Sequence, residues 1–423
     1  MTYPYQGIIG VATAYHLSQL SPRLTIHLLD SSPSLFASAS GKAAGFLARD
    51  WFPPPTASLA ALSFDLHRRL AEEHDGPQQW GYSPSTTFSL PEAQRALDKG
   101  EHWLLEGLSR STSAVVVDVE HNDTTALPLW LAAGREGSPP PADVLSSGAT
   151  TAQVYVDHHF WLTLRCDVLR CRDPLRLCQF LLSQCLSRNV HVHHPVIITD
   201  LITSPDNAIT GLTIRSPAGS TTVLPCDALL LTAGVWTPRV FEVLFPHATV
   251  SLPITHLSGH SIVLRSPRWT VPEPSATTSC HAIFTTDQDA RFSPEIFSRA
   301  GGDIYLAGLN TTAIPIPEFA SEVQPEPASI EALMRTARKL LGDDEFEVLG
   351  TGFCHRPVSK SGPPLLTRLT PQQTGVGLHG GIWVSAGHGP WGISMSLGTG
   401  LALAELILCY SPSADVSQLA LHI

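Results

Sequence analysis

The sequence predicts an α/β fold with an additional strand-rich lobe, and two parts of the chain carry that prediction. Near the start, Gly7 and Gly10 precede a run of small and apolar residues, which is typical of a short buried helix. The apolar run 24–29 then reads as a strand that ends in Asp30. Much further along, 228–232 is a continuous apolar run of the kind that lies inside a parallel sheet. A glycine turn, helix, strand and acidic strand end in this order form half of a βαβ unit.

The remaining elements follow from the same local signals. Asp173 and Pro174 suit the N-cap and first turn of a helix whose apolar residues share one face. Triple prolines at 53–55 and 139–141 mark an irregular region that favours an inserted lobe. The other expected elements are strands within 190–223 and 250–325, a helix over 329–341, a strand at 382–385 and a final helix that follows a glycine-rich turn and ends near Leu408.

Length and composition restrict the class of protein. The 423 residues exceed what a single core usually holds, and 43% hydrophobic against 15% charged residues exclude a disordered or fibrous chain. A net charge of -11 argues against nucleic acid or an acidic membrane surface and favours small molecules as partners. Without an apolar stretch long enough to span a bilayer, or a leader-like start, we expect a soluble, cytoplasmic protein. The 8 cysteines lack paired CxxC spacing and are expected to be reduced.

The first turn carries part of a dinucleotide-binding fingerprint. In the frame G-x-G-x-x-G, Gly7 and Gly10 hold the second and third places, which allow close approach to a pyrophosphate and helix-strand packing. Tyr5 stands where the first glycine belongs, and no apolar strand precedes it. Asp30 is placed to accept hydrogen bonds from a ribose hydroxyl. An ordinary α/β turn followed by an exposed aspartate is the alternative interpretation.

Five segments, taken together, extend this fingerprint into a family resemblance. They are 7–10, 39–45, 232–236, 355–357 and 387–393. Over nearly its whole length the chain resembles the FAD-dependent oxidoreductases that include D-amino acid oxidase, glycine oxidase and sarcosine oxidase, with a fungal branch as the nearest match. The resemblance implies a Rossmann-like FAD-binding domain interleaved with a mixed β-sheet substrate domain of α+β type. The implied FAD-binding parts are 1–50, 145–240 and 340–423, and the implied substrate-binding parts are 51–144 and 241–339.

The resemblance also implies a set of cofactor-binding residues. Those expected to bind FAD are Gly7, Ile9, Gly10, Asp30, Ser31, Ser40, Gly41, Lys42, Val196, Ala233, Gly234, Trp236, Cys354, Gly389, Trp391, Gly392 and Ile393. Val196 is expected to act through its backbone, and so is the turn at Ala233 and Gly234. A helix that begins near Gly392 would direct its positive N-terminus at the flavin. Cys354 aligns with a cysteine that some members join covalently to the flavin, although a buried small hydrophobe is the alternative.

Arg356 is the candidate for substrate binding. Its planar guanidinium can hold a carboxylate through two charge-assisted hydrogen bonds, although a structural ion pair is the alternative. The resemblance implies that the carbon beside a neutral amine is oxidised by hydride transfer to the flavin, without a protein base. Molecular oxygen is the implied acceptor, and a small amine or amino acid is the implied substrate. A noncatalytic chain without FAD and a dehydrogenase with another acceptor are the rival hypotheses.

Two further features lie outside this pattern. The cluster of His191, His193 and His194 suggests a metal site, but strand alternation leaves only two of them on one face, so we expect no metal. Residues 155–172 match nothing expected of the family and are either a genuine insertion or retained noncoding sequence. Together with the missing first strand, they are the points at which the chain departs from the pattern.

Overall fold

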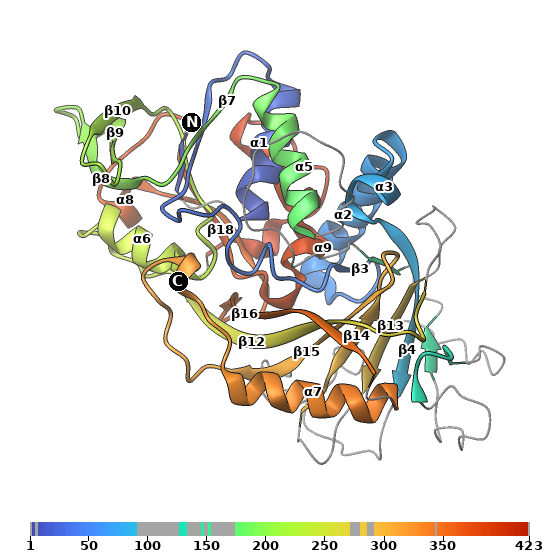
Figure 1. The fold of residues 1–423 in the computed structure, drawn as a ribbon. Coiled ribbons are helices and arrows are strands. Elements are labelled where there is room, and N and C mark those ends of the chain that lie inside the picture. The colour runs from blue at the N-terminus through green and yellow to red at the C-terminus, as the bar shows by residue number, and fades with distance from the viewer. Residues whose placement is uncertain are drawn as a thin grey trace.

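The computed structural model describes residues 2–4, 7–90, 127–132, 145–147, 151–153, 174–270, 280–285, 292–342 and 345–421, with side chains from residue 7 on outside 89–90, 145–147 and 151–153 (Figure 1). The strands are β1 Thr2–Pro4, β2 Ile26–Leu29, β3 Phe46–Ala48, β4 Ser83–Leu90, β5 Leu145–Ser147, β6 Thr151–Gln153, β7 Val190–His193, β8 Ile197–Thr203, β9 Ile209–Arg215, β10 Thr221–Pro225, β11 Leu229–Leu231, β12 Ile254–Arg265, β13 Cys280–Thr285, β14 Glu295–Ser298, β15 Asp303–Thr311, β16 Glu347–Ser359, β17 Leu365–Leu369 and β18 Ile382–Ala386. The α-helices are α1 Ile8–Leu20, α2 Pro54–Glu73, α3 Gly76–Trp80, α5 Pro174–Leu186, α6 Thr237–Leu244, α7 Pro327–Leu341, α8 Pro371–Thr374 and α9 Gly392–Ile407. The 3-10 helices are η2 Gly234–Trp236, η3 Ala320–Glu322, η4 Gly389–Trp391 and η5 Ser417–Leu419.

A six-stranded sheet in the order β17-β18-β11-β1-β2-β7 forms one half of the protein. Strand β1 lies in its interior and pairs in parallel with both β11 and β2. The expectation that the first strand is missing is therefore wrong. Three residues without an apolar run suffice here, because two neighbouring strands supply the hydrogen-bond ladders and the tertiary context overrides local propensity. Strand β1 thus completes the βαβ unit, of which the sequence predicts only the helix α1 and the strand β2.

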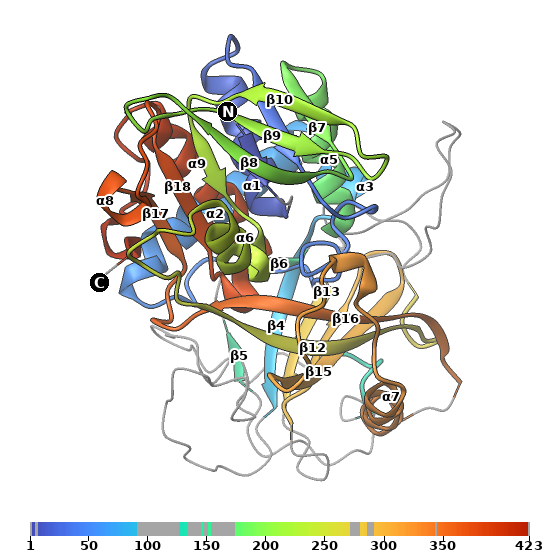
Figure 2. The ribbon, with the colours of Figure 1, turned by 90° about the vertical axis from the view of Figure 1, so that its left-hand side faces the viewer.

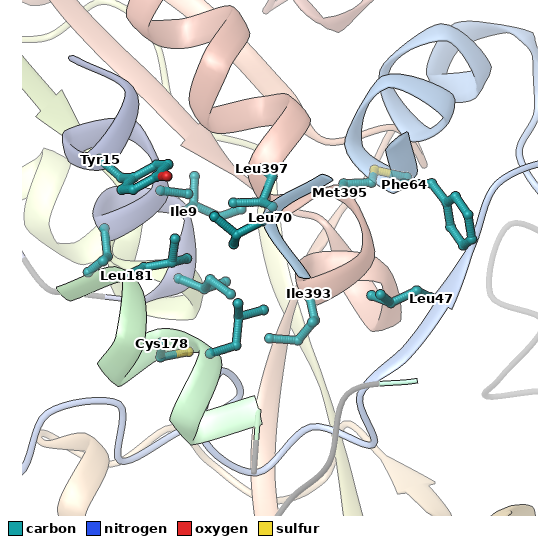
Figure 3. Packing of buried hydrophobic residues seen from close by; sticks show 14 of the residues in the cluster. Ile9, Tyr15, Leu47, Phe64, Leu70, Cys178, Leu181, Ile393, Met395 and Leu397 are labelled. Atoms are coloured by element: carbon teal, nitrogen blue, oxygen red, sulfur yellow. The ribbon is translucent and has the colours of Figure 1, made fainter. Parts of the chain in front are cut away.

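Helices α1, α2, α5 and α9 pack together around one hydrophobic core (Figure 3). Small residues let α1 and α9 approach closely, since a Cβ added to Gly400 would lie 2.6 Å from the carbonyl carbon of Ala12. On α5, Cys178 and Leu181 are fully buried against this core, which confirms the predicted apolar face of that helix. The close contact between α1 and α9 fixes where the first turn of α1 lies relative to the start of α9.

A larger, nine-stranded sheet contains β16, β12, β15, β14, β13, β4, β6 and β3 in order, with β5 beside β4. Helix α7 covers one of its faces through Leu333, Ala337 and Leu341 (Figures 1 and 2). The helices of the six-stranded half lie on the opposite side (Figure 1). The division into domains stays a prediction, and this sheet cuts across it, because β16 lies within 340–423 and yet pairs with β12.

A separate three-stranded sheet, β10-β9-β8, lies beside the six-stranded half (Figure 2). Among the described residues, no group of three or more histidine, cysteine, aspartate or glutamate side chains could hold a metal ion. The rings of His27 and His193 instead contact each other, with Nδ1 and Nε2 3.0 Å apart. No helix in the described part of the chain is long and apolar enough to cross a membrane. The segment 155–172 lies outside the described residues.

Candidate cofactor and substrate site

A cavity with about 1250 Å³ of empty space, open solvent at its mouth included, lies between the two large sheets. One wall consists of the first turn of α1, the loop 30–45 and the turns that follow β11 and β18. The opposite wall is the face of the nine-stranded sheet that carries Tyr305, Cys354 and Arg356. The cavity thus meets the carboxyl ends of parallel strands, where open α/β sheets bind ligands.

The glycine turn lies at the N-terminus of α1. Gly7 is the N-cap, and the backbone N–H of Ile8 donates a hydrogen bond to Ser40 Oγ at 3.0 Å. A Cβ added to Gly10 would lie 2.7 Å from Thr232 Oγ1, so Gly10 permits close packing of helix and strand as the fingerprint predicts. The first turn of α1 contains no acidic residue, which leaves its partial positive charge available to an anion.

Asp30 is buried at the end of β2 and lines the cavity. Its Oδ1 accepts a hydrogen bond from the N–H of Ser32 at 2.7 Å. The backbone oxygen of Asp30 accepts a hydrogen bond from the backbone N–H of Val196 at 2.8 Å. The Val196 N–H is therefore engaged with the β2 loop, while the Asp30 carboxylate lies at the cavity wall. The alternative interpretation of Asp30 as an exposed aspartate is therefore wrong.

Four hydroxyl groups of the cavity wall are buried without a hydrogen-bond partner among the described residues. They belong to Ser32, Ser38, Thr232 and Ser385. A buried polar group without a partner costs roughly 1–3 kcal/mol, and native proteins have few of them. A ligand rich in hydroxyl, phosphate and carbonyl groups would satisfy them, so the chemistry of this wall fits a dinucleotide.

Two turns open directly toward the cavity. Gly234 and Gly389 have φ values of 56° and 55°, and a Cβ built on either would meet no atom within 4 Å. A positive φ favours glycine, and here the glycine backbone also leaves open space beside the cavity. Trp236, in the first of these turns, is anchored by a hydrogen bond from Nε1 to Pro317 O at 2.9 Å. Both turns can thus bring backbone close to a bound molecule.

Helix α9 begins at Gly392, beside the cavity, as the sequence predicts. The preceding His388 is buried, and its Nε2 lies 3.2 Å from Thr399 Oγ1. Burial lowers the pKa of His388 to about 4, so the imidazole is neutral near pH 7. The first turn of α9 lacks an acidic residue. Its positive end is therefore not cancelled from within the helix.

Lys42 and Cys354 meet at the strand-rich wall of the cavity. Lys42 Nζ donates to Phe353 O at 3.1 Å, and burial lowers the pKa of this lysine. The Tyr305 hydroxyl donates to Lys42 O at 3.2 Å, which holds the loop 30–45 against the sheet. Cys354 is buried and unoxidised at the cavity surface. Within the described ranges, Lys42 makes no ion pair with a carboxylate.

Arg356 lies on the same strand, two residues beyond Cys354, and also lines the cavity. Its Nη1 donates a hydrogen bond to Asn310 Oδ1 at 2.7 Å. Among the residues that the structure describes, Arg356 has no acidic group within ion-pair distance. Its partner is a neutral amide, so the structural ion pair considered from the sequence is not formed with any described residue.

Most of the residues expected to bind cofactor or substrate line this cavity. They are Gly7, Ile9, Asp30, Ser40, Lys42, Ala233, Gly234, Trp236, Cys354, Arg356, Gly389, Gly392 and Ile393. The wall also contains residues that the sequence did not single out, among them Glu295, Tyr305 and Ala307. These lie inside strands, where no turn or glycine motif marks them. The available signal was the alternation of side chains between the two faces of β15 and β16. This alternation does not tell which face meets the cavity.

The expected residues outside the wall are Gly10, Ser31, Gly41, Val196 and Trp391. Gly41 instead allows the loop to fold on itself, since a Cβ there would lie 2.3 Å from Phe36 O. Trp391 packs edge-to-face on Phe52, with ring centroids 4.6 Å apart. These residues support the segments that form the wall.

A largely parallel sheet whose strands end at a cavity, faced by a second sheet and by the side chains of Lys42 and Arg356, is typical of a two-lobed enzyme that binds a nucleotide cofactor. A model of the family DAO, FAD dependent oxidoreductase, matches residues 6–406, and the chain belongs to that family. Its cofactor is FAD, and it is an oxidoreductase. The sequence-based assignment of fold and cofactor is thereby confirmed.

Relatives and solved structures agree with this assignment over almost the full chain. The protein C1F5.03c of Schizosaccharomyces pombe, named provisionally as an oxidoreductase, is 26% identical over 95% of this chain and 92% of its own length. A D-amino acid dehydrogenase of Methylobacterium nodulans is 25% identical over 96% of this chain and 94% of its own. The structure of glycine oxidase from Geobacillus kaustophilus has a TM-score of 0.71 at 19% identity, covering 100% of this chain and 98% of that one. At that identity the last match shows the fold.

Proposed function

We propose that the chain oxidises the CH–NH bond of a small amine or amino acid that carries a carboxylate, and that Arg356 binds this carboxylate. The observation that carries the proposal is the cavity-lining guanidinium of Arg356, whose described partner is the neutral Asn310. A desolvated arginine can hold a carboxylate through two parallel hydrogen bonds, each charge-assisted. A second cation, Lys42, lies at the same wall and favours an anionic substrate further.

The cofactor would be held along the opposite wall. Gly7 and the first turn of α1 would receive the pyrophosphate, and Asp30 would accept hydrogen bonds from a ribose. The turns at Gly234 and Gly389 would approach the ring system through their backbone, and the start of α9 would stabilise negative charge on it. Bound FAD would supply the acceptor for the hydride of the substrate. The uncompensated hydroxyl groups of this wall support the assignment.

The substrate amine would enter in its neutral form. His355 and His388 are the imidazoles of the cavity wall, and burial is the main cause that lowers the pKa of each to about 4. His355 Nδ1 also lies 2.6 Å from Ser258 Oγ, so that nitrogen is engaged. Neither ring is then charged near pH 7, and the residues of the chain serve to orient the substrate and to exclude water.

Molecular oxygen is the proposed electron acceptor. A dehydrogenase that passes electrons to another acceptor is the second candidate, and the D-amino acid dehydrogenases among the relatives favour it. Production of hydrogen peroxide and reduction of an artificial dye, measured side by side on a panel of amino acids and N-methyl amino acids, separate the two. Peroxide formed in proportion to substrate supports the oxidase, and dye reduction without peroxide supports the dehydrogenase.

The carboxylate site has its own test. Replacing Arg356 by lysine or alanine should weaken binding of carboxylate-bearing amines at least about tenfold, near 1.4 kcal/mol, while FAD stays bound. Calorimetric titration of the FAD-loaded protein with acetate and with benzoate measures the effect. Arg239→Ala, an exposed arginine on α6, is the matched control and should leave binding unchanged. Equal carboxylate affinity in Arg356→Ala and the unmodified protein would remove Arg356 from the site.

A further inference from the structure

We propose that Asn310 is a positioning residue, which holds the guanidinium of Arg356 at the cavity wall without neutralising its charge. The inference rests on the proposed function, in which Arg356 binds the substrate carboxylate. It assigns a role to a residue that carries no motif and lies on a different strand from Arg356. Three features of the strand-rich wall support it.

The first feature is an irregularity in β15. Ser258 of β12 pairs with Thr311, but His260 pairs with Gly308, so two residues of β15 face one residue of β12. The two residues are Leu309 and Asn310, and Leu309 has a φ of 53°, in the left-handed region that non-glycine residues rarely adopt. A bulge of this kind turns a side chain toward a new direction, and such strained residues occur mainly where function requires them. Here it accompanies the contact of Asn310 with Arg356.

The second feature is the glycine opposite the bulge. A Cβ added to Gly259 would lie 2.6 Å from both Arg356 Nη2 and Asn310 Oδ1, and 2.7 Å from Arg356 Nη1. The guanidinium and the amide therefore lie directly over the backbone of Gly259. Any side chain there would displace the pair, so this position on β12 gives the pair its space. Position 259 also pairs in register with Cys354 of β16.

The third feature is the chemistry of the contact. Asn310 Oδ1 accepts a hydrogen bond from Arg356 Nη1 at 2.7 Å, which fixes one edge of the planar group. An amide is neutral, whereas a carboxylate in the same place would form an ion pair with the guanidinium and compete with the substrate. Within the described residues, Arg356 has no acidic partner. The arrangement thus orients the arginine and keeps its charge for an incoming anion.

Replacing Asn310 by aspartate separates positioning from mere structural support. Asn310→Asp keeps an acceptor for Nη1 but neutralises the guanidinium. We expect at least about a tenfold loss of acetate and benzoate affinity in calorimetry on the FAD-loaded protein, with FAD content and melting temperature retained. Unchanged affinity would show that a neutral partner beside Arg356 is not required. Asn207→Asp, in an exposed turn, is the matched control and should bind both probes like the unmodified protein.

A second variant leaves both side chains chemically intact. Gly259→Ala displaces the guanidinium and the amide from their place above the backbone and should also weaken carboxylate binding about tenfold. It keeps the test decisive if Asn310→Asp fails to load FAD. If either FAD-loaded variant keeps its carboxylate affinity while Arg356→Ala has lost it, the role of Asn310 is refuted and the proposed function still stands. If neither probe binds the unmodified protein, or if Arg356→Ala binds both equally well, the proposed function itself fails and the inference with it.

Discussion

The two walls of the cavity present their chemistry in different ways. On the wall formed by the six-stranded half, glycine turns and helix N-termini bring the backbone to the cavity surface, as at Gly7, Gly234 and Gly392. On the wall formed by the nine-stranded sheet, side chains from strand interiors do so, as with Cys354 and Arg356. The first wall therefore depends on backbone conformation and on the close packing of α1 against α9 behind it. The second depends on the direction of a few side chains.

The largest expected effect tests the packing of the first wall. Gly400→Val inserts side-chain atoms where a Cβ alone would lie 2.6 Å from the backbone of Ala12. Overpacking of this kind should lower the free energy of unfolding by about 3 kcal/mol and reduce FAD content, because α1 and α9 must separate. Urea unfolding with and without added FAD measures both effects. Leu401→Met, half-buried on the same helix, is the control with conserved volume.

Cofactor affinity gives the next effect. Asp30→Ala should weaken FAD binding about tenfold, near 1.4 kcal/mol, through loss of the buried acceptor at the end of β2. Asp30→Asn keeps an acceptor for the Ser32 N–H and should lose less of the affinity for FAD. Flavin fluorescence during titration of the apoprotein gives the dissociation constants, with the exposed Asp206→Ala as control. If Asp30→Ala binds FAD as tightly as the control, Asp30 does not contact the ribose.

Acid should destabilise the six-stranded half of the protein through its buried histidines. Burial lowers the pKa of His67 and His388 from 6.5 to about 4, so each is neutral in the folded protein and gains a proton more readily on unfolding. Stability is thus full above pH 6.5 and falls as the pH drops toward 4, by at most about 1.4 kcal/mol per pH unit for each histidine. Replacing His67 by glutamine should reduce this slope in unfolding curves between pH 7 and 5.

The smallest effect concerns Cys354 on the second wall. Cys354→Ala removes one buried sulfur and should cost about 1 kcal/mol of stability. We expect FAD to be held noncovalently, so acid precipitation of the unmodified protein should release flavin into the supernatant. Flavin that stays in the pellet of the unmodified protein, and is released from the Cys354→Ala variant, would show a thioether to Cys354 instead.

The sequence by itself determined the parts of the protein that depend on local backbone conformation. Gly7, Gly10 and Asp30 predict the helix and second strand of the βαβ unit, and the glycine-rich turn before Gly392 predicts the start of α9. Glycines at such turns are required by steric constraints that act within a few residues, so they are visible in the chain itself. Arg356 could be proposed as well, because its motif resembles that of the family. The neighbouring Asn310 could not.

Tertiary structure decided what depends on partners far apart in the chain. Strand β1 carries no apolar pattern, and it forms because β2 and β11 pair with it on both sides. Tyr305, Gly259 and Asn310 come together with Arg356 only through the register of β12, β15 and β16 and through the bulge at Leu309. Strand alternation gives every second residue the same face but does not select the face that meets a cavity. That choice follows from the packing of the two sheets and the helices between them, which no local pattern contains.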